Sequence, residues 1–153
     1  MIRKLFLFCI LLLLTNCGYE PIYVKSNNSY LNFGEINTSG NEKINKRILA
    51  LTGIEKRSGN SSSYLLILDS KKQREIVAKN SAGNATSYKI SIKIKISLTD
   101  PIDKEKIIKS KEFNSSFTYN NAENKFQLSQ DEKNILNNLI ESTSEKIVIY
   151  LNS

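Results

Sequence analysis

The clearest pattern in the sequence is a strict alternation of apolar and polar residues from Tyr88 to Leu98. Every second position is apolar, and the positions between carry lysine or serine, including Lys89, Lys93 and Lys95. Successive side chains of a β-strand point to opposite faces, so a period of two predicts a strand with one buried and one polar face. We expect the three lysines to lie on the polar face.

Apolar runs before and after this strand predict two further strands. The earlier one covers about residues 64–78 and is followed by a turn that contains Gly83. The later one covers about residues 106–119, where the adjacent Ile107 and Ile108 interrupt the alternation. Such an interruption indicates a bulge or a change of register. The three strands are expected to form a meander.

Two segments show the spacing of apolar residues typical of an amphipathic helix. The first covers residues 40–52, with the spacing of a capping box at Ser39 and Glu42 and with Gly53 placed to end the helix in a left-handed conformation. The second begins with the same capping-box spacing at Ser129–Glu132 and extends almost to the C-terminus. Its apolar face consists of Ile135, Leu136, Leu139, Ile140, Thr143, Ile147 and Leu151.

A short first strand is expected before these elements, and it completes the fold prediction. Its residues are Tyr30, Leu31, Phe33 and Ile36, with a break at Gly34. The resulting order, β-α-β-β-β-α, predicts a two-layer α+β fold in which two amphipathic helices cover one face of an about four-stranded mixed sheet. We expect a single domain over residues 30–153.

The first sixteen residues have the composition of a secretory signal peptide. Arg3 and Lys4 supply a positive start, and the apolar run Leu5–Leu14 follows. Ten residues in a helix extend about 15 Å, roughly half the thickness of the hydrocarbon core of a bilayer. The run is therefore too short for a stable transmembrane helix, and we interpret it as an export signal.

Cys17 follows this run directly, in the sequence Leu14-Thr15-Asn16-Cys17-Gly18, which resembles the lipobox of bacterial lipoproteins. The cysteine thiol is the nucleophile that takes a diacylglyceryl group, and the amine freed by cleavage takes a further acyl chain. Asn16 departs from the small residue usual there, and an incidental thiol in an ordinary signal is the alternative. Two or three acyl chains give stable anchoring, so residues 17–29 are predicted to be a lipidated N-terminus and tether.

Composition excludes several classes of function. The chain has no histidine, and its two cysteines, Cys9 and Cys17, both precede the predicted domain. Disulfide frameworks, His/Cys zinc sites and His-activated nucleophiles are thereby excluded from the domain. The formal charge of +7 comes from lysines dispersed along the chain rather than from basic runs, which argues against nucleic acid as a partner. The carboxylates are scattered as well, so no catalytic residue, metal or cofactor is expected.

The start of the exported chain, Cys17-Gly18-Tyr19-Glu20-Pro21-Ile22-Tyr23, is similar to the Cys-Gly-aromatic-x-Pro-Leu-Tyr start of the outer-membrane lipopolysaccharide-assembly lipoproteins, the E component of the lipopolysaccharide transport system. The strand at Tyr64–Leu68, the alternating strand and the terminal helix follow in the same order. The resemblance implies a lipoprotein at the periplasmic face of the outer membrane. It further implies a non-catalytic plug in a large β-barrel, which supports assembly of that barrel and the insertion of lipopolysaccharide.

On this resemblance, Lys89, Lys93 and Lys95, with Arg74 on the preceding strand, are candidates for contact with phosphates of lipopolysaccharide or with acidic groups of the barrel. The alternative is that the lysines form a solvated face that discourages edge pairing. For the chain as a whole, the alternative is a lipid-anchored accessory domain of another cell-envelope complex.

Overall fold

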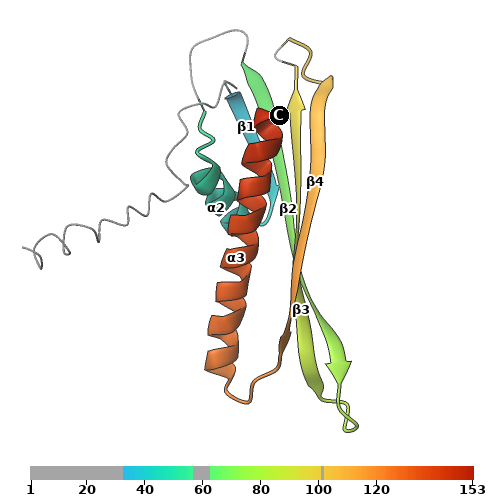
Figure 1. Cartoon of the computed structure of the whole chain (residues 1–153). Helices are drawn as coiled ribbons and strands as arrows, with labels where there is room; N and C mark the ends of the chain where they lie inside the picture. Colours follow the sequence, from blue (N-terminus) through green and yellow to red (C-terminus); the bar gives the residue numbers. More distant parts are fainter. Residues whose placement is uncertain (1–32, 57–62, 101) are drawn as a thin grey trace, which may run out of the picture.

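A computed structural model describes residues 33–56, 63–100 and 102–153 of the chain. The elements are β1 (Phe33–Gly40), α2 (Glu42–Thr52), β2 (Tyr64–Lys79), β3 (Ala85–Thr99), β4 (Ile107–Asn120) and α3 (Lys125–Asn152). This order and the two-layer arrangement in Figure 1 confirm the predicted α+β fold. The predicted signal peptide, Cys17 and the tether lie outside the described residues.

The four strands form one mixed sheet in the order β1-β2-β3-β4. β1 runs parallel to β2, whereas β2, β3 and β4 form the predicted antiparallel meander. Ile107 pairs with Thr99 and Lys109 pairs with Leu98, so Ile108 is the additional residue of a bulge. The bulge predicted from the two adjacent isoleucines is therefore confirmed.

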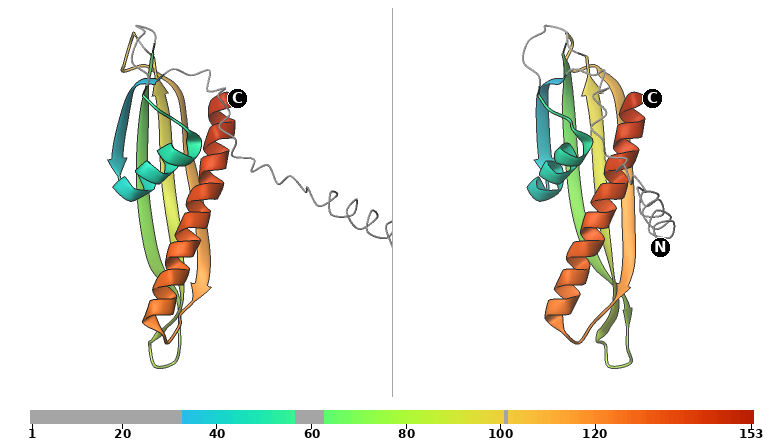
Figure 2. Two further views of the ribbon diagram at one scale, coloured as in Figure 1. Left: turned by 90° about the vertical axis from the view of Figure 1, so that its left-hand side faces the viewer. Right: turned by 60° about the vertical axis from the view of Figure 1, so that its left-hand side comes forward.

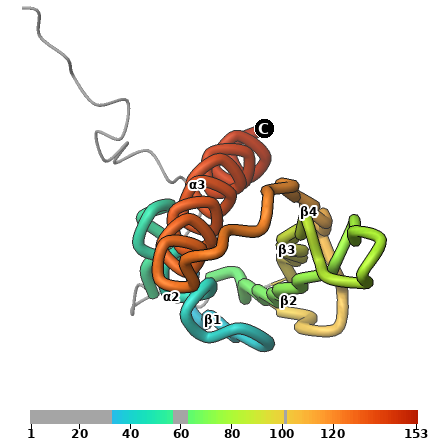
Figure 3. Tube along the Cα trace, turned by 90° about the horizontal axis from the view of Figure 1, so that it is seen from below, coloured from blue at the N-terminus to red at the C-terminus, as the bar shows by residue number. Residues whose placement is uncertain are grey.

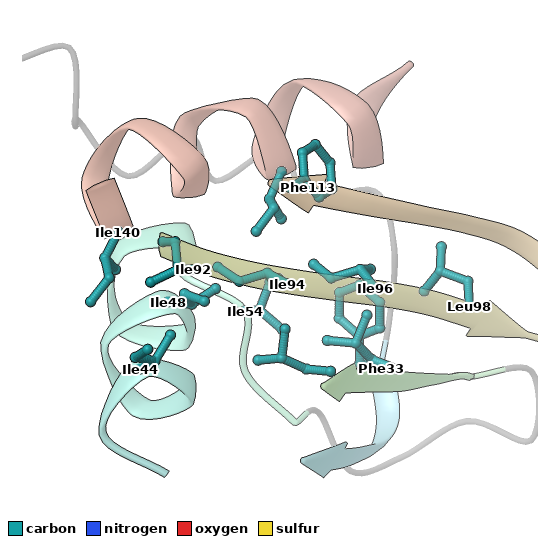
Figure 4. Close-up of a cluster of buried hydrophobic side chains, with 13 residues drawn as sticks. Phe33, Ile44, Ile48, Ile54, Ile92, Ile94, Ile96, Leu98, Phe113 and Ile140 are labelled. Atoms are coloured by element: carbon teal, nitrogen blue, oxygen red, sulfur yellow. The ribbon is translucent and has the colours of Figure 1, made fainter. Parts of the chain in front are cut away.

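Both helices cover the same face of the sheet, as Figures 2 and 3 show. α2 contacts β1 and β2, and α3 contacts β3 and β4. The core between the layers contains the even-numbered apolar residues of β3, namely Ile92, Ile94, Ile96 and Leu98, with side chains from both helices (Figure 4). We call this side of the sheet the covered face and the opposite side the open face.

β1 ends at Gly40 because the backbone turns there toward α2. Gly40 has a φ of +83°, and a Cβ atom at this position would lie 1.9 Å from the carbonyl oxygen of Ser70. Only glycine permits this approach, since it lacks the side chain and tolerates a positive φ. β2 has no partner on its outer edge beyond Ser70 among the described residues, because pairing with β1 stops at this point.

The helix cap predicted at Ser39 is wrong. Ser39 is part of β1, and its hydroxyl donates to the Asp69 carboxylate. Asn41 caps α2 instead, and its side-chain oxygen accepts from the backbone N–H of Ile44. The predicted end of the helix is correct, because Gly53 adopts the left-handed conformation with φ +66°.

The helix start predicted from the second capping-box spacing is also wrong, because an asparagine again caps the helix in place of the serine. α3 begins at Lys125, and Asn124 is its cap, with a side chain that accepts from the backbone N–H groups of Phe126 and Gln127. Ser129 lies inside the helix, one turn after its start. Asparagine and serine cap helices about equally well, so the spacing alone does not identify which of the two residues caps the helix.

β1 differs in part from its prediction. The strand continues through Gly34, although pairing with β2 shifts its register between Phe33 and Glu35. It also extends to Gly40, past the predicted end near Ile36. Tyr30 and Leu31 lie outside the described residues.

Candidate interaction surface

The three candidate lysines of β3 lie on the open face, as the alternation predicts. Their partners in the antiparallel ladder share this face because directly paired residues point to the same side. Lys89 pairs with Glu75 and Thr118, Lys93 with Lys71 and Asn114, and Lys95 with Asp69 and Glu112. The open face of β2, β3 and β4 therefore carries both acidic and basic side chains, and Lys95 has a carboxylate residue paired with it on each side.

Two of these lysines form ion pairs with carboxylates on neighbouring strands. Lys89 Nζ lies 3.2 Å from Glu75 Oε1, and Lys93 Nζ lies 3.2 Å from Glu112 Oε1. Hydrogen bonds from Asn114 and Lys93 lower the pKa of Glu112. The open face thus carries paired charges, and an anion that binds to these lysines must compete with carboxylates already in place.

Arg74, the fourth candidate, lies on the covered face and is separated from the lysines by the sheet. It pairs with Ile90, so its side chain points toward α3. The guanidinium carbon lies 3.7 Å from the centroid of the Tyr88 ring, a cation–π contact. Arg74 and the three lysines, predicted together as candidate contacts, therefore lie on opposite faces of the sheet.

Arg74 instead takes part in a hydrogen-bond network that joins β2, β4 and α3. Its Nε donates to Tyr119 Oη at 3.0 Å and to Glu132 Oε1 at 2.8 Å. The Tyr119 hydroxyl also donates to Glu132 Oε1, at 2.7 Å. Burial and this hydrogen bond to Glu132 raise the pKa of Tyr119. The network fixes the first turns of α3 against the sheet.

The sequence does not predict this network, although the parity of Arg74 in β2 is a signal for it. Even-numbered residues of β2, such as Leu66 and Leu68, point into the core, and Arg74 has the same parity. The polar run from Ser70 to Glu75 hides this alternation, so the sequence pattern does not predict a partner for Arg74.

An open groove of about 420 Å³ lies between β4 and the last turns of α3. Its lining includes Lys111, Phe113, Lys146, Ile149 and Tyr150. Lys111 Nζ is 5.3 Å from the Phe113 ring centroid and 5.1 Å from that of Tyr150. The lining is amphipathic and contains one carboxylate, Glu112.

In the described part of the chain, the Asp and Glu side chains form no group of three or more that would hold a metal ion. Among its helices, none combines the length and the apolar composition needed to cross a membrane.

The fold is similar to solved structures of bacterial lipoproteins. The rare lipoprotein B of Shewanella oneidensis matches with a TM-score of 0.57 at 11% identity, over 74% of this chain and 90% of that one. A lipoprotein B of Nitrosomonas europaea, described as uncharacterized, matches with a TM-score of 0.58 at 11% identity, over 78% and 83% of the two chains. A minor lipoprotein of Acinetobacter baumannii gives 0.53 at 13% identity, over 76% and 90%. At these identities the likeness concerns the fold.

Comparison with curated protein sequences gives no match. A protein family matches residues 19–151, and its description is LptE, lipopolysaccharide-assembly. The match begins two residues after Cys17 and includes every described helix and strand except the last residue of α3. The chain therefore belongs to the LptE family of lipopolysaccharide-assembly proteins.

Proposed function

We propose that the protein is a non-catalytic, lipid-anchored lipoprotein of the outer membrane that assists assembly of a β-barrel lipopolysaccharide translocon and insertion of lipopolysaccharide. The family match over residues 19–151 carries this proposal, since it covers nearly the whole domain and names lipopolysaccharide assembly. The lipoprotein folds of the similar structures support it.

Sequence features support anchoring at Cys17. The residue follows an apolar run of ten residues after a positive start, which is the order of an export signal. Two or three acyl chains on one residue would hold the domain at the membrane. Gly18 occupies the position after the cysteine, and a glycine there is compatible with transfer of the lipoprotein to the outer membrane.

The carboxylates of the open face support a role in binding rather than catalysis. Asp69 accepts a hydrogen bond from Ser39, and Glu75 and Glu112 form ion pairs with lysines. General acid–base catalysis requires a carboxyl group whose pKa is brought near the working pH. The pKa of Glu112 is instead lowered, which favours a permanently charged partner for lysine.

Within this proposal, Lys89, Lys93 and Lys95 contact phosphates of lipopolysaccharide or acidic groups of the barrel. Lys93 and Lys95 are exposed, and their ammonium groups are able to exchange one anionic partner for another. Arg74 is held by Tyr119 and Glu132, so we assign it a structural role.

Metabolic labelling with a palmitate analogue tests the anchor. The wild-type chain and Cys9→Ala should take up the label, and Cys17→Ala should lose it, because only the residue at the cleavage point acquires acyl chains. Label that persists in Cys17→Ala contradicts the assignment.

Purification of the full-length chain in mild detergent tests the proposed partner. A large β-barrel should co-purify in stoichiometric amount, together with lipopolysaccharide. A different fixed partner would favour the alternative of an accessory domain in another envelope complex.

A further inference from the structure

The loop between β3 and β4 exposes large apolar side chains. Ile102 is 91% exposed, and the first residues of β4, Ile107 and Ile108, are 58% and 49% exposed. Burial of an isoleucine side chain is favourable, so an exposed isoleucine in the loop and two more at the start of β4 indicate a surface with an apolar partner.

Hydrogen bonds within the loop hold this arrangement. Asp100 Oδ1 accepts from the backbone N–H groups of Ile102 at 2.8 Å and Asp103 at 3.2 Å. The backbone N–H of Asp100 donates to the carbonyl of Lys106 at 2.9 Å, which closes the base of the loop. The acidic side chain of Asp100 is thus turned toward the backbone, while Ile102 is left pointing outward.

The loop lies at the end of the sheet where β1 begins. Phe33 pairs with Tyr64, Leu65 pairs with Thr99, and Thr99 pairs with Ile107, so these residues form successive rungs at one end. Lys104 Nζ is 3.0 Å from Glu35 Oε2, which joins the loop directly to β1. Figure 1 shows the loop, the start of β1 and the C-terminus at the same end of the molecule.

The covalent chain restricts how far this end lies from the anchor. Sixteen peptide steps separate Cys17 from Phe33, and at full extension they span at most about 55 Å. With acyl chains on Cys17, the end that contains Phe33 is the part of the domain nearest the membrane along the chain. The β2–β3 hairpin and the start of α3 lie at the opposite end of the molecule from the start of β1 (Figure 1).

The charges of the loop indicate an apolar rather than an electrostatic contact. Between Asp100 and Lys109 the chain has three lysines and three carboxylates. A balanced set of charges gives little net attraction to anionic headgroups. The lysines have long apolar stems that can lie along the interface while their ammonium groups remain in water.

We propose that Ile102, Ile107 and Ile108 contact the lipid interface of the membrane that holds the acyl anchor. This contact orients the domain so that the β2–β3 hairpin points away from that membrane. The inference rests on the anchor at Cys17 that the proposed function includes. It adds a second, reversible membrane contact to the covalent one.

Tryptophan fluorescence of the full-length, lipidated chain tests this contact. The chain has no tryptophan, so Ile102→Trp introduces a single probe at a position with room for it. Phe126→Trp is the matched control, because Phe126 is 72% exposed at the opposite end, in the first turn of α3. Each variant is reconstituted in vesicles of phosphatidylethanolamine and phosphatidylglycerol, with and without bromine on the acyl chains, and vesicle flotation is measured in parallel.

For Ile102→Trp we expect a blue-shifted emission and about a twofold loss of intensity in brominated vesicles, because an interfacial side chain reaches the boundary between headgroups and acyl chains. The emission of Phe126→Trp should be the same in both kinds of vesicle. The Ile102→Trp signal should also be insensitive to salt, since the loop carries no net charge.

Two outcomes overturn the proposal for a chain that floats with the vesicles: no quenching in Ile102→Trp, or equal quenching in both variants. The anchor itself is then unaffected. A chain that fails to float overturns the anchor and the loop contact together. Flotation thus distinguishes failure of the proposed function from failure of this inference.

Discussion

The two faces of β3 show opposite uses of the same alternating strand. On the covered face Ile90, Ile92, Ile94 and Ile96 are at most 1% exposed and pack beneath the helices. On the open face Lys89 and Lys93 are joined to carboxylates of β2 and β4. Apolar burial on the covered face stabilises the fold, whereas the exposed ion pairs of the open face contribute little to stability. Substitutions on the two faces should therefore differ in their effects.

The largest effect on stability is expected for Ile94→Ala on the covered face. Ile94 is 0% exposed and lies in the main core, so the substitution removes apolar contacts and leaves a cavity. We expect the free energy of unfolding to fall by about 3–4 kcal/mol in denaturant titrations.

Ile107→Ala is the matched control, since Ile107 is 58% exposed at the edge of the open face. Its effect in solution should be within about 0.5 kcal/mol. Equal losses in the two variants would contradict the contrast between the faces.

An intermediate effect is expected for Tyr119→Phe, at the polar network of the covered face. The substitution removes the hydroxyl that joins Arg74 and Glu132 but keeps the ring and the direct contact between those two residues. We expect a loss of about 1 kcal/mol in the free energy of unfolding. A larger loss than for Ile94→Ala would show that the network, rather than apolar burial, dominates this face.

The same tyrosine gives a prediction for pH. Its pKa is raised in the folded state by burial and by the hydrogen bond to Glu132, so the folded protein favours the neutral hydroxyl. The corresponding stabilisation is complete below the unfolded pKa of about 10 and is lost as the pH rises through the folded pKa. The stability difference between wild type and Tyr119→Phe should therefore decrease in alkaline solution. A difference independent of pH in this range contradicts the assignment.

The smallest effect on stability is expected on the open face, for the double substitution Lys93→Glu and Lys95→Glu. Exposed ion pairs contribute little to stability, so the denaturation midpoint should change only slightly. Binding of lipopolysaccharide by the purified protein should weaken. The double substitution Lys125→Glu and Lys133→Glu on α3, which changes the net charge equally, should leave binding intact. Unchanged binding in the open-face variant removes these lysines as a contact site.

Several elements followed directly from local sequence. The alternation in β3, the bulge at Ile108 and the end of α2 at Gly53 are each fixed by neighbouring residues, and each prediction is confirmed. The helix starts were wrong, because Asn41 and Asn124 compete with the serines of the capping boxes as N-terminal caps. The hydrogen-bond partners of Arg74 were not predicted, because they are 45 and 58 residues away in the chain.

By itself the sequence determined the order of elements and the buried face of β3, and it predicts an anchor at Cys17, because periodicity and short motifs depend only on nearby residues. The tertiary structure decided that β1 joins β2 in parallel, that the open-face lysines face carboxylates, and that Arg74 belongs to the covered face. These features depend on the register between strands. Register results from the packing of distant segments, and a local pattern does not contain it.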